Sequence, residues 1–162
     1  MGVLTLGVFA LALMQVGSKR PAAQCAAPPG PGVNWEFCPL AGRDFRTSDL
    51  QGAVLRNAQL AGADFSGADL RGADLAYADL SAAVLRDVRL GGGRLTGAML
   101  RGAVLTGSDL RRADLGFADL TGARLTGSLL QGANLEQTIL PSGQTCEQAQ
   151  LQACLRAILG AE

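Results

Sequence analysis

The sequence predicts an all-β solenoid, a fold in which the chain winds into coils stacked around one core. Three features predict it. Every fifth residue from Phe45 to Leu140 is Leu or Phe, without exception. The residue two places earlier is usually Ala, and the residue two places later is often Gly. On an α-helix this period would spread the large side chains around the whole surface, whereas a coil that turns every five residues points them all inward.

Each five-residue unit has the local pattern of a short strand. Residues i−2 and i of a strand share one face, so Ala63 with Phe65, and Ala68 with Leu70, form inward-facing pairs. The next pair lies an odd number of residues away and would face outward unless the chain turned in between. Glycines such as Gly67 supply the backbone freedom for such a turn. The sequence therefore predicts one turn for every five residues.

Units such as residues 68–72 (ADLRG) and 73–77 (ADLAY) resemble the repeats of the pentapeptide-repeat family, which follow the pattern A-[D/N]-L-x-x. The resemblance covers residues 38–142. It implies a right-handed quadrilateral β-helix with four pentapeptides per coil, and therefore about five coils. Residues 20 apart would then lie above one another, which places Phe45 and Phe65 in one inward column.

The N-terminal segments differ in composition from the repeats. Residues 1–18 include an apolar run and are expected to form a signal peptide or a weak membrane anchor. Lys19 and Arg20 follow this run instead of preceding it, which is the reverse of the usual order for export. Residues 19–37 are rich in Pro, Gly and Ala and are assigned to a linker and an N-terminal cap.

Residues 143–162 are assigned to a C-terminal cap. Its composition is that of a helix from Glu147 to Leu159, with apolar residues at helical spacing. These residues are Leu151, Leu155, Ile158 and Leu159. We expect the tail and Trp35 to cover the two open ends of the solenoid, which would otherwise expose unpaired strand edges.

All four cysteines lie outside the repeats or at their edge, and this even number after a signal-like segment predicts two disulfides. Three pairings are possible, of which the local pairs Cys25–Cys38 and Cys146–Cys154 are favoured. The second pair requires the helix to begin near Gln150. A continuous helix from Cys146 would hold the two cysteines about 12 Å apart, which is too far for a disulfide.

The outward residues that precede the large inward residues form three informative columns. They read Asp69, Arg89, Asp109, then Asp74, Arg94, Asp114, then Asp79, Met99, Asp119. Around the middle coil, a basic belt is formed by Arg86, Arg89, Arg94 and Arg101. The belt is interpreted either as a charge-compensated ladder on a solvated surface or as a site for an anion or an acidic partner.

Two aromatic residues share another outward column. Tyr77 and Phe117 lie in it with Gly97 between them. They are interpreted either as the walls of a shallow binding notch or as isolated exposed rings. The candidate partner-binding residues are therefore Arg89, Arg94, Tyr77 and Phe117.

Composition argues against several functions. The chain has no His, and its Asp residues recur with the repeat, so we expect no catalytic residue, no metal site and no cofactor. Residues 38–142 contain 11 acidic residues and 11 Arg, so no net field would attract nucleic acid. A membrane partner is expected only through the N-terminal segment, if it is not cleaved.

The sequence therefore favours a non-catalytic protein-interaction or structural module that is exported to the periplasm or the extracellular space. A cytoplasmic or membrane-anchored location is the alternative. The family resemblance also implies an alternative function, which is mimicry of duplex DNA toward DNA gyrase, as in quinolone-resistance members. That activity requires a strongly acidic rod, whereas here Arg residues interrupt the Asp columns.

Overall fold

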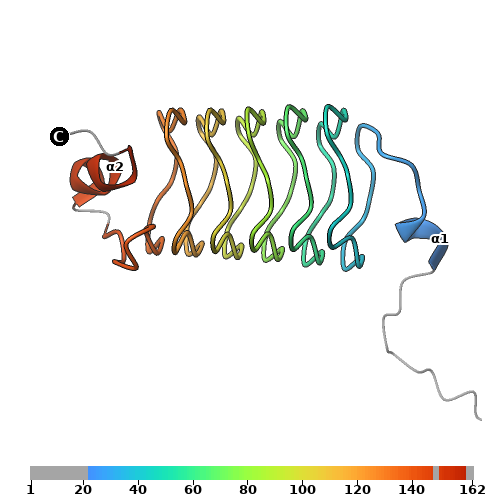
Figure 1. Ribbon diagram of the computed structural model, residues 1–162, viewed down its shortest axis with the longest axis horizontal. Helices are drawn as coiled ribbons and strands as arrows, with labels where there is room; N and C mark the ends of the chain where they lie inside the picture. Colours follow the sequence, from blue (N-terminus) through green and yellow to red (C-terminus); the bar gives the residue numbers. More distant parts are fainter. Residues whose placement is uncertain (1–21, 148–149, 160–162) are drawn as a thin grey trace, which may run out of the picture.

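The structure is a computed structural model that describes residues 22–147 and 150–159. Its main body is a rod of stacked coils, with helix α1 (Ala22–Cys25) at one end and helix α2 (Leu151–Leu159) at the other (Figure 1). The expected signal or anchor segment, residues 1–18, lies outside the described residues. Neither described helix has the length and apolar character that a membrane span needs.

Each coil contains 20 residues. Parallel bridges join residues 20 positions apart, from the pair Asn34 and Val54 to the pair Asp119 and Ile139. The bridged residue is always the one that precedes a large inward residue, so the described coils are joined by ladders of single bridges instead of extended strands. Because one turn follows every five residues, four pentapeptides make one coil and the solenoid is four-sided.

A tight turn separates neighbouring sides of the coil. In the turn from Leu50 to Ala53, the Ala53 N–H donates to the Leu50 carbonyl at 3.0 Å, and Gly52 has a φ of 64°. A positive φ at the third residue is characteristic of a type II turn, and Gly adopts it at the lowest cost. Tyr77 (58°) and Phe117 (60°) occupy the same turn position with a positive φ, although side chains disfavour it.

The Asp that precedes the inward residue has a structural role that the sequence analysis did not assign. Its carboxylate accepts a hydrogen bond from the second turn residue, as Asp74 does from the Ala76 N–H at 3.1 Å and Asp79 from the Ser81 N–H at 3.0 Å. Asn134 accepts the same bond. This Asx bond satisfies a backbone donor that, in the described coils, takes no part in the ladders.

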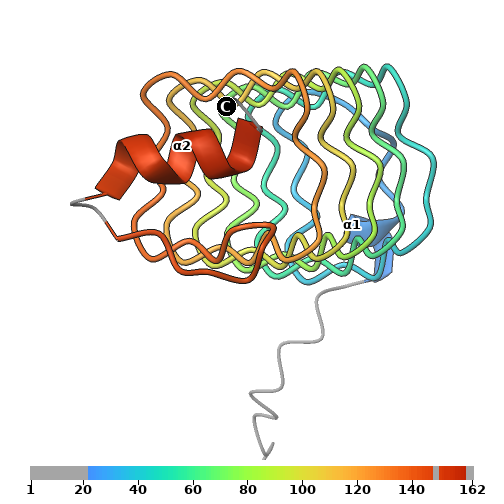
Figure 2. The ribbon, with the colours of Figure 1, turned by 60° about the vertical axis from the view of Figure 1, so that its left-hand side comes forward.

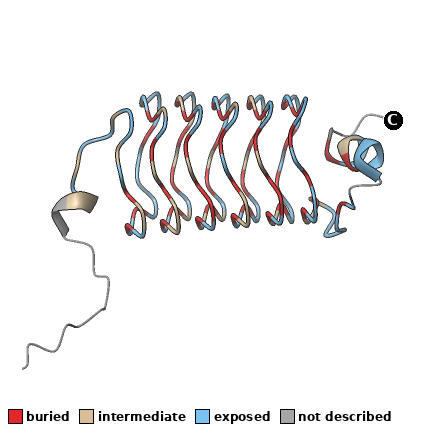
Figure 3. Cartoon of the chain, turned by 180° about the vertical axis from the view of Figure 1, so that it is seen from behind, coloured by how far each residue is buried: buried red, intermediate tan, exposed pale blue. Residues whose placement is uncertain are grey.

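The inward side chains fill the rod, so buried and exposed residues alternate along every coil (Figure 3). Phe45 and Phe65 stack in the expected column, with ring centroids 5.0 Å apart. Trp35 is fully buried and packs against Phe45 at 5.1 Å, above the column that continues with Leu55. The expected N-terminal cap residue is thus the first member of the core, and the pattern of turns and bridges already includes residues 31–37.

The C-terminal segment covers the last coil by folding back along it. Thr145 forms an antiparallel bridge with Ile139, and the Cys146 N–H donates to the Thr138 carbonyl at 2.7 Å. A hairpin therefore occupies backbone groups that would otherwise form an open edge.

Helix α2 then lies across the end of the rod (Figure 2). Cys154 and Ile158 are buried against the core, and Leu155 packs beside them. Leu151 is 38% exposed and lies outside this buried face, although its spacing placed it on the same stripe.

The cysteines form the two local disulfides expected from the sequence. Cys25 and Cys38 have Cα atoms 5.4 Å apart, and Cys146 and Cys154 have Cα atoms 5.7 Å apart. The second pair is compatible with the helix because α2 begins at Leu151, after Cys146. The first disulfide joins α1 to the solenoid, and the second joins α2 to the hairpin that covers the last coil.

Candidate interaction surface

Arg89 and Arg94 lie on adjoining sides of one coil, with the turn from Leu90 to Gly93 between them. Arg89 is bridged to Asp69 and Asp109 in the neighbouring coils, so the alternation of charge expected from the sequence is present. Its Nη1 lies 3.5 Å from an Asp69 oxygen, and the Nη1 of Arg94 lies 3.7 Å from an Asp74 oxygen. More than half of each Arg side chain remains exposed.

The four residues of the basic belt are spread around one coil. Because each side of the coil spans five residues, Arg86 and Arg101 lie at other corners of the same coil. Arg101 donates through Nε to Asp119 at 2.6 Å. Arg86 precedes Arg89 by three residues and lies at the other end of its side, whereas Arg89 and Arg94 flank the turn from Leu90 to Gly93.

The expected aromatic notch is not open. Tyr77 and Phe117 are 58% and 63% exposed, as expected for outward residues. A Cβ atom added to Gly97 would lie 2.6 Å from the Tyr77 Cε1 atom, so the Tyr77 ring lies over Gly97. The ring itself fills the space that the glycine leaves. The two aromatic residues also lie at a different corner from the turn that Arg89 and Arg94 flank.

Ion pairs hold two outward carboxylates in their charged form. The Arg71 guanidinium donates to Asp69 through Nε and Nη2, at 2.8 and 2.6 Å, and lowers the pKa of Asp69. Arg111 binds Asp109 with the same two atoms and distances and lowers its pKa for the same reason. These bidentate pairs repeat two coils apart on the side that carries Arg89.

Between these two pairs the surface is hollowed. Gly91 lies in the column between Arg71 and Arg111, and Gly92 lies in the adjacent corner column beside Arg112. We call Gly91 and Gly92 the glycine corner. A Cβ atom on Gly92 would meet nothing within 4 Å, and one on Gly91 would meet only the Arg111 carbonyl oxygen, at 3.7 Å.

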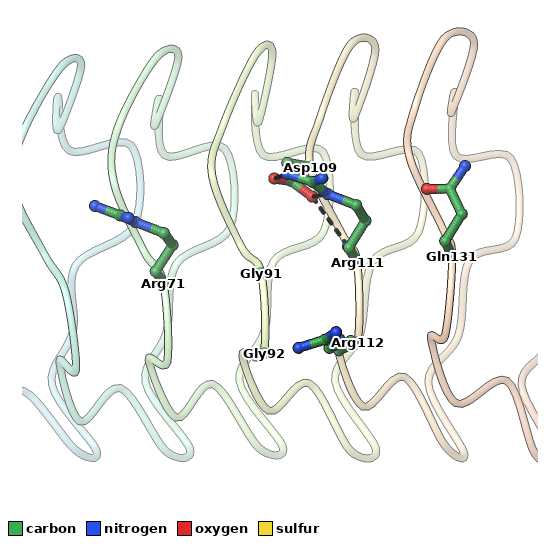
Figure 4. Close-up of a pocket in the computed structure, with 7 residues that line it drawn as sticks. All are labelled: Arg71, Gly91, Gly92, Asp109, Arg111, Arg112 and Gln131. Carbon is green, nitrogen blue, oxygen red and sulfur yellow. Dashed lines mark hydrogen bonds and ion pairs between the residues drawn. The ribbon is translucent and has the colours of Figure 1, made fainter.

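The hollow has a volume of about 540 Å³. Asp109 and Gln131 complete its lining. Figure 4 shows Arg112 reaching from the next coil toward Gly92, whereas the Arg111 side chain rises to Asp109 and the Arg71 side chain points away from the glycine corner. Sequence analysis missed this hollow, although three consecutive glycines at residues 91–93 were a signal for it.

The described residues contain no group of three His, Cys, Asp or Glu side chains that could hold a metal ion. Outward carboxylates such as Asp69 and Asp109 instead accept hydrogen bonds from a backbone N–H and from an Arg side chain. This side of the rod therefore carries ion pairs, and the glycine corner lies between two of them.

The profile of the pentapeptide repeats matches the chain in eight copies, over residues 44–76, 78–116 and 118–154. The chain belongs to the pentapeptide-repeat family. Proteins of this family form right-handed quadrilateral β-helices. This pentapeptide-repeat protein has no significant sequence match among curated proteins.

Several solved structures of pentapeptide-repeat proteins are similar to this chain. Rfr23 from the cyanobacterium Cyanothece 51142 is 40% identical over 49% of this chain and 54% of its own, with a TM-score of 0.49. A thylakoid lumen protein of Arabidopsis thaliana is 26% identical, with coverages of 72% and 77% and a TM-score of 0.37. QnrB1, a plasmid-mediated fluoroquinolone resistance protein, is 26% identical, with coverages of 75% and 66% and a TM-score of 0.33. The chain thus spans about half the length of Rfr23.

Proposed function

We propose that this protein is a non-catalytic, exported member of the pentapeptide-repeat family that acts as an interaction or structural module. The observation that carries the proposal is the division between inward and outward positions. The inward columns hold buried apolar side chains, such as Leu70 and Leu90, in every described coil. Among the described residues, charged side chains are confined to the outward columns, where a partner would bind.

The state of the reactive side chains supports a non-catalytic role. All four cysteines are joined in disulfides, so none offers a thiol nucleophile. The sequence has no His to act as a base. Outward carboxylates such as Asp69 and Asp74 accept backbone and Arg hydrogen bonds that fix the turns, which accounts for their presence without catalysis.

The disulfides also support export. Disulfides persist in oxidising compartments and are rare in the bacterial or eukaryotic cytosol. Here one disulfide joins α1 to the first coil and the other joins α2 to the hairpin on the last coil, so both end segments are linked by bonds that persist in an oxidising environment.

The test is the intact mass of the protein isolated from its own host, alkylated with and without prior reduction. We expect a chain shortened within residues 1–24, because cleavage there would remove the signal-like segment and keep Cys25. We also expect four alkylated thiols after reduction and none before it. A full-length chain with four free thiols would contradict export.

The alternative is a cytoplasmic DNA mimic that acts on DNA gyrase. A specific observation weighs against it, since Arg89 and Arg94 pair with Asp69 and Asp74 and interrupt the negative columns that would imitate a phosphate backbone. A supercoiling assay with purified gyrase separates the two functions. We expect no inhibition, and inhibition at micromolar concentrations of this protein would favour the alternative.

A further inference from the structure

The glycine corner differs from its neighbours in one hydrogen bond. On the same side of the rod, the second turn residue of three other coils donates its N–H to an Asp carboxylate. Gln51 does so to Asp49, Arg71 to Asp69 and Arg111 to Asp109, at 3.1–3.2 Å. By contrast, Gln131, which follows Leu129 by two residues, has no such acceptor among the described residues. At the glycine corner, Arg89 replaces the Asp. Within the described residues, the Gly91 N–H therefore has no acceptor.

Three arginines line the hollow that contains Gly91, namely Arg71, Arg111 and Arg112. Arg111 binds Asp109 through Nε and Nη2, so its Nη1 is not engaged with a described residue. Arg112 forms no ion pair within the described part of the chain, and its side chain reaches toward Gly92 (Figure 4). Arg89 adds a further guanidinium on the same side.

The balance of charge at the glycine corner is positive. Arg71 and Arg111 each neutralise one carboxylate, those of Asp69 and Asp109. Arg89 shares Asp69 at a longer distance of 3.5 Å, and Arg112 has no carboxylate partner among the described residues. Because Asp109 is paired, its charge opposes an incoming anion less than a free carboxylate would.

We propose that the glycine corner binds a dianionic tetrahedral oxyanion, a phosphate or sulfate group. One oxygen accepts the Gly91 N–H and so takes the position of the Asp carboxylate in the neighbouring coils. Arg112 and the Nη1 of Arg111 donate to the other oxygens, and Arg89 contributes charge. A backbone N–H together with guanidinium groups is a donor set that recognises such anions.

This inference deepens the proposed interaction function by naming the chemistry of a ligand, but it does not depend on export. It is tested on purified protein, so its failure would leave the mass measurement and the export proposal untouched. Conversely, a cytoplasmic chain with a phosphate site would contradict only the export proposal.

The experiment follows backbone amides by ¹⁵N NMR while inorganic phosphate, and separately inorganic sulfate, is added to the protein in the form isolated from its host. Sodium chloride at matched ionic strength is the reference, because general screening affects all exposed charges. We expect a saturable shift of the Gly91 amide with phosphate and sulfate and not with chloride. A shift that never saturates, or that chloride reproduces, would overturn the proposal.

Three variants localise the site. Arg89→Asp recreates the Asx acceptor for the Gly91 N–H, and Arg112→Gln removes one donor. We expect either change to weaken phosphate binding about tenfold or more, as the loss of a charged hydrogen bond does. Arg124→Gln removes the same charge from a different side of the rod and is the matched control. Equal weakening in Arg124→Gln, or unchanged binding in both Arg89→Asp and Arg112→Gln, would contradict the site.

A further comparison separates a free ion from a group carried by a larger molecule. Methyl phosphate offers the same dianion with one oxygen esterified. Because the hollow is open to solvent at Gly92, we expect methyl phosphate to bind within about threefold of inorganic phosphate, which is a difference of less than 1 kcal/mol. Saturable binding of inorganic phosphate alone would restrict the ligand to the free ion.

Discussion

At the scale of single residues, the turn position with positive φ explains both the glycines of the repeat and its exceptions. Ala82 has a φ of 55°, in the same corner column where Gly62 has a φ of 67° in the preceding coil. Both positions are exposed, and a Cβ atom at Gly62 would meet nothing within 4 Å. Any difference between Gly and Ala here therefore comes from the backbone and not from packing.

We predict that Ala82→Gly raises the free energy of unfolding by about 0.5–1 kcal/mol, because relief of the left-handed conformation exceeds the entropy that Gly loses on folding. Gly62→Ala, one coil away, should lower it by a similar amount. Urea unfolding of both variants measures the effect. Destabilisation by Ala82→Gly would show that backbone entropy dominates at this corner.

The Asx bond assigns a second role at the residue scale, which Asp79 tests in isolation. Its Oδ1 accepts the Ser81 N–H at 3.0 Å. We predict that Asp79→Ala lowers the free energy of unfolding by about 0.5–1.5 kcal/mol, the usual contribution of one hydrogen bond. Asp79→Asn should cost much less, since Asn134 already accepts the equivalent bond elsewhere. Equal losses in the two variants, measured by urea unfolding, would indicate that charge and not the acceptor matters.

The sequence predicted which residues point inward but not what the outward side chains do. The inward columns follow from period alone, because a Leu such as Leu70 has only one direction in a coil that turns every five residues. The Tyr77 ring over Gly97 and the approach of Arg112 to Gly92 depend on side-chain rotamers, which the repeat does not determine. The preference for Asp or Asn before Leu was a signal for the Asx bonds that period and charge alone do not reveal.

At the scale of elements, the two ends of the solenoid are the parts that the repeat does not stabilise. A solenoid coil is stabilised by its neighbours, so terminal coils need a different cover. The hairpin at Thr145 and helix α2 supply this cover at the C-terminal end, and the disulfide from Cys146 to Cys154 holds them together. Spacing predicted the helix, but its start at Leu151 was set by the need to bring the two cysteines together.

We predict that replacing Cys146 and Cys154 together by Ser lowers the free energy of unfolding by about 2–3 kcal/mol. Release of α2 should also expose the last coil and cause association that increases with protein concentration, because an open edge pairs with other chains. Sedimentation velocity measures this association. The matched control replaces Cys25 and Cys38 by Ser, which leaves the C-terminal cover in place. Association of the control to the same extent would mean that the C-terminal edge is not its cause.

At the scale of the whole molecule, the outward surface is a set of charge pairs without net charge. The ladders place acidic residues one above another, and Arg residues such as Arg89 and Arg94 separate them. Each exposed pair contributes little alone. The paired arginines nevertheless lower the pKa of several carboxyl groups, such as those of Asp69 and Asp109.

These shifts predict how the rod responds to acid. The Arg46 side chain lowers the pKa of Asp44 to about 2. Burial raises the pKa of Asp114, but hydrogen bonds from Thr96 and from the Gly116 N–H outweigh it, so that pKa is also lowered. A carboxyl whose pKa is lower in the folded chain stabilises it above the unfolded pKa of about 3.9, and this stabilisation is lost as pH falls through the folded pKa.

We therefore expect the free energy of unfolding to be level above about pH 5 and to fall progressively between about pH 4 and pH 2. Urea unfolding at successive pH values measures this dependence. Asp114→Asn removes one titrating group and should reduce the slope in that window, whereas a wild-type profile that stays level to pH 2 would show that the paired carboxylates do not stabilise the rod.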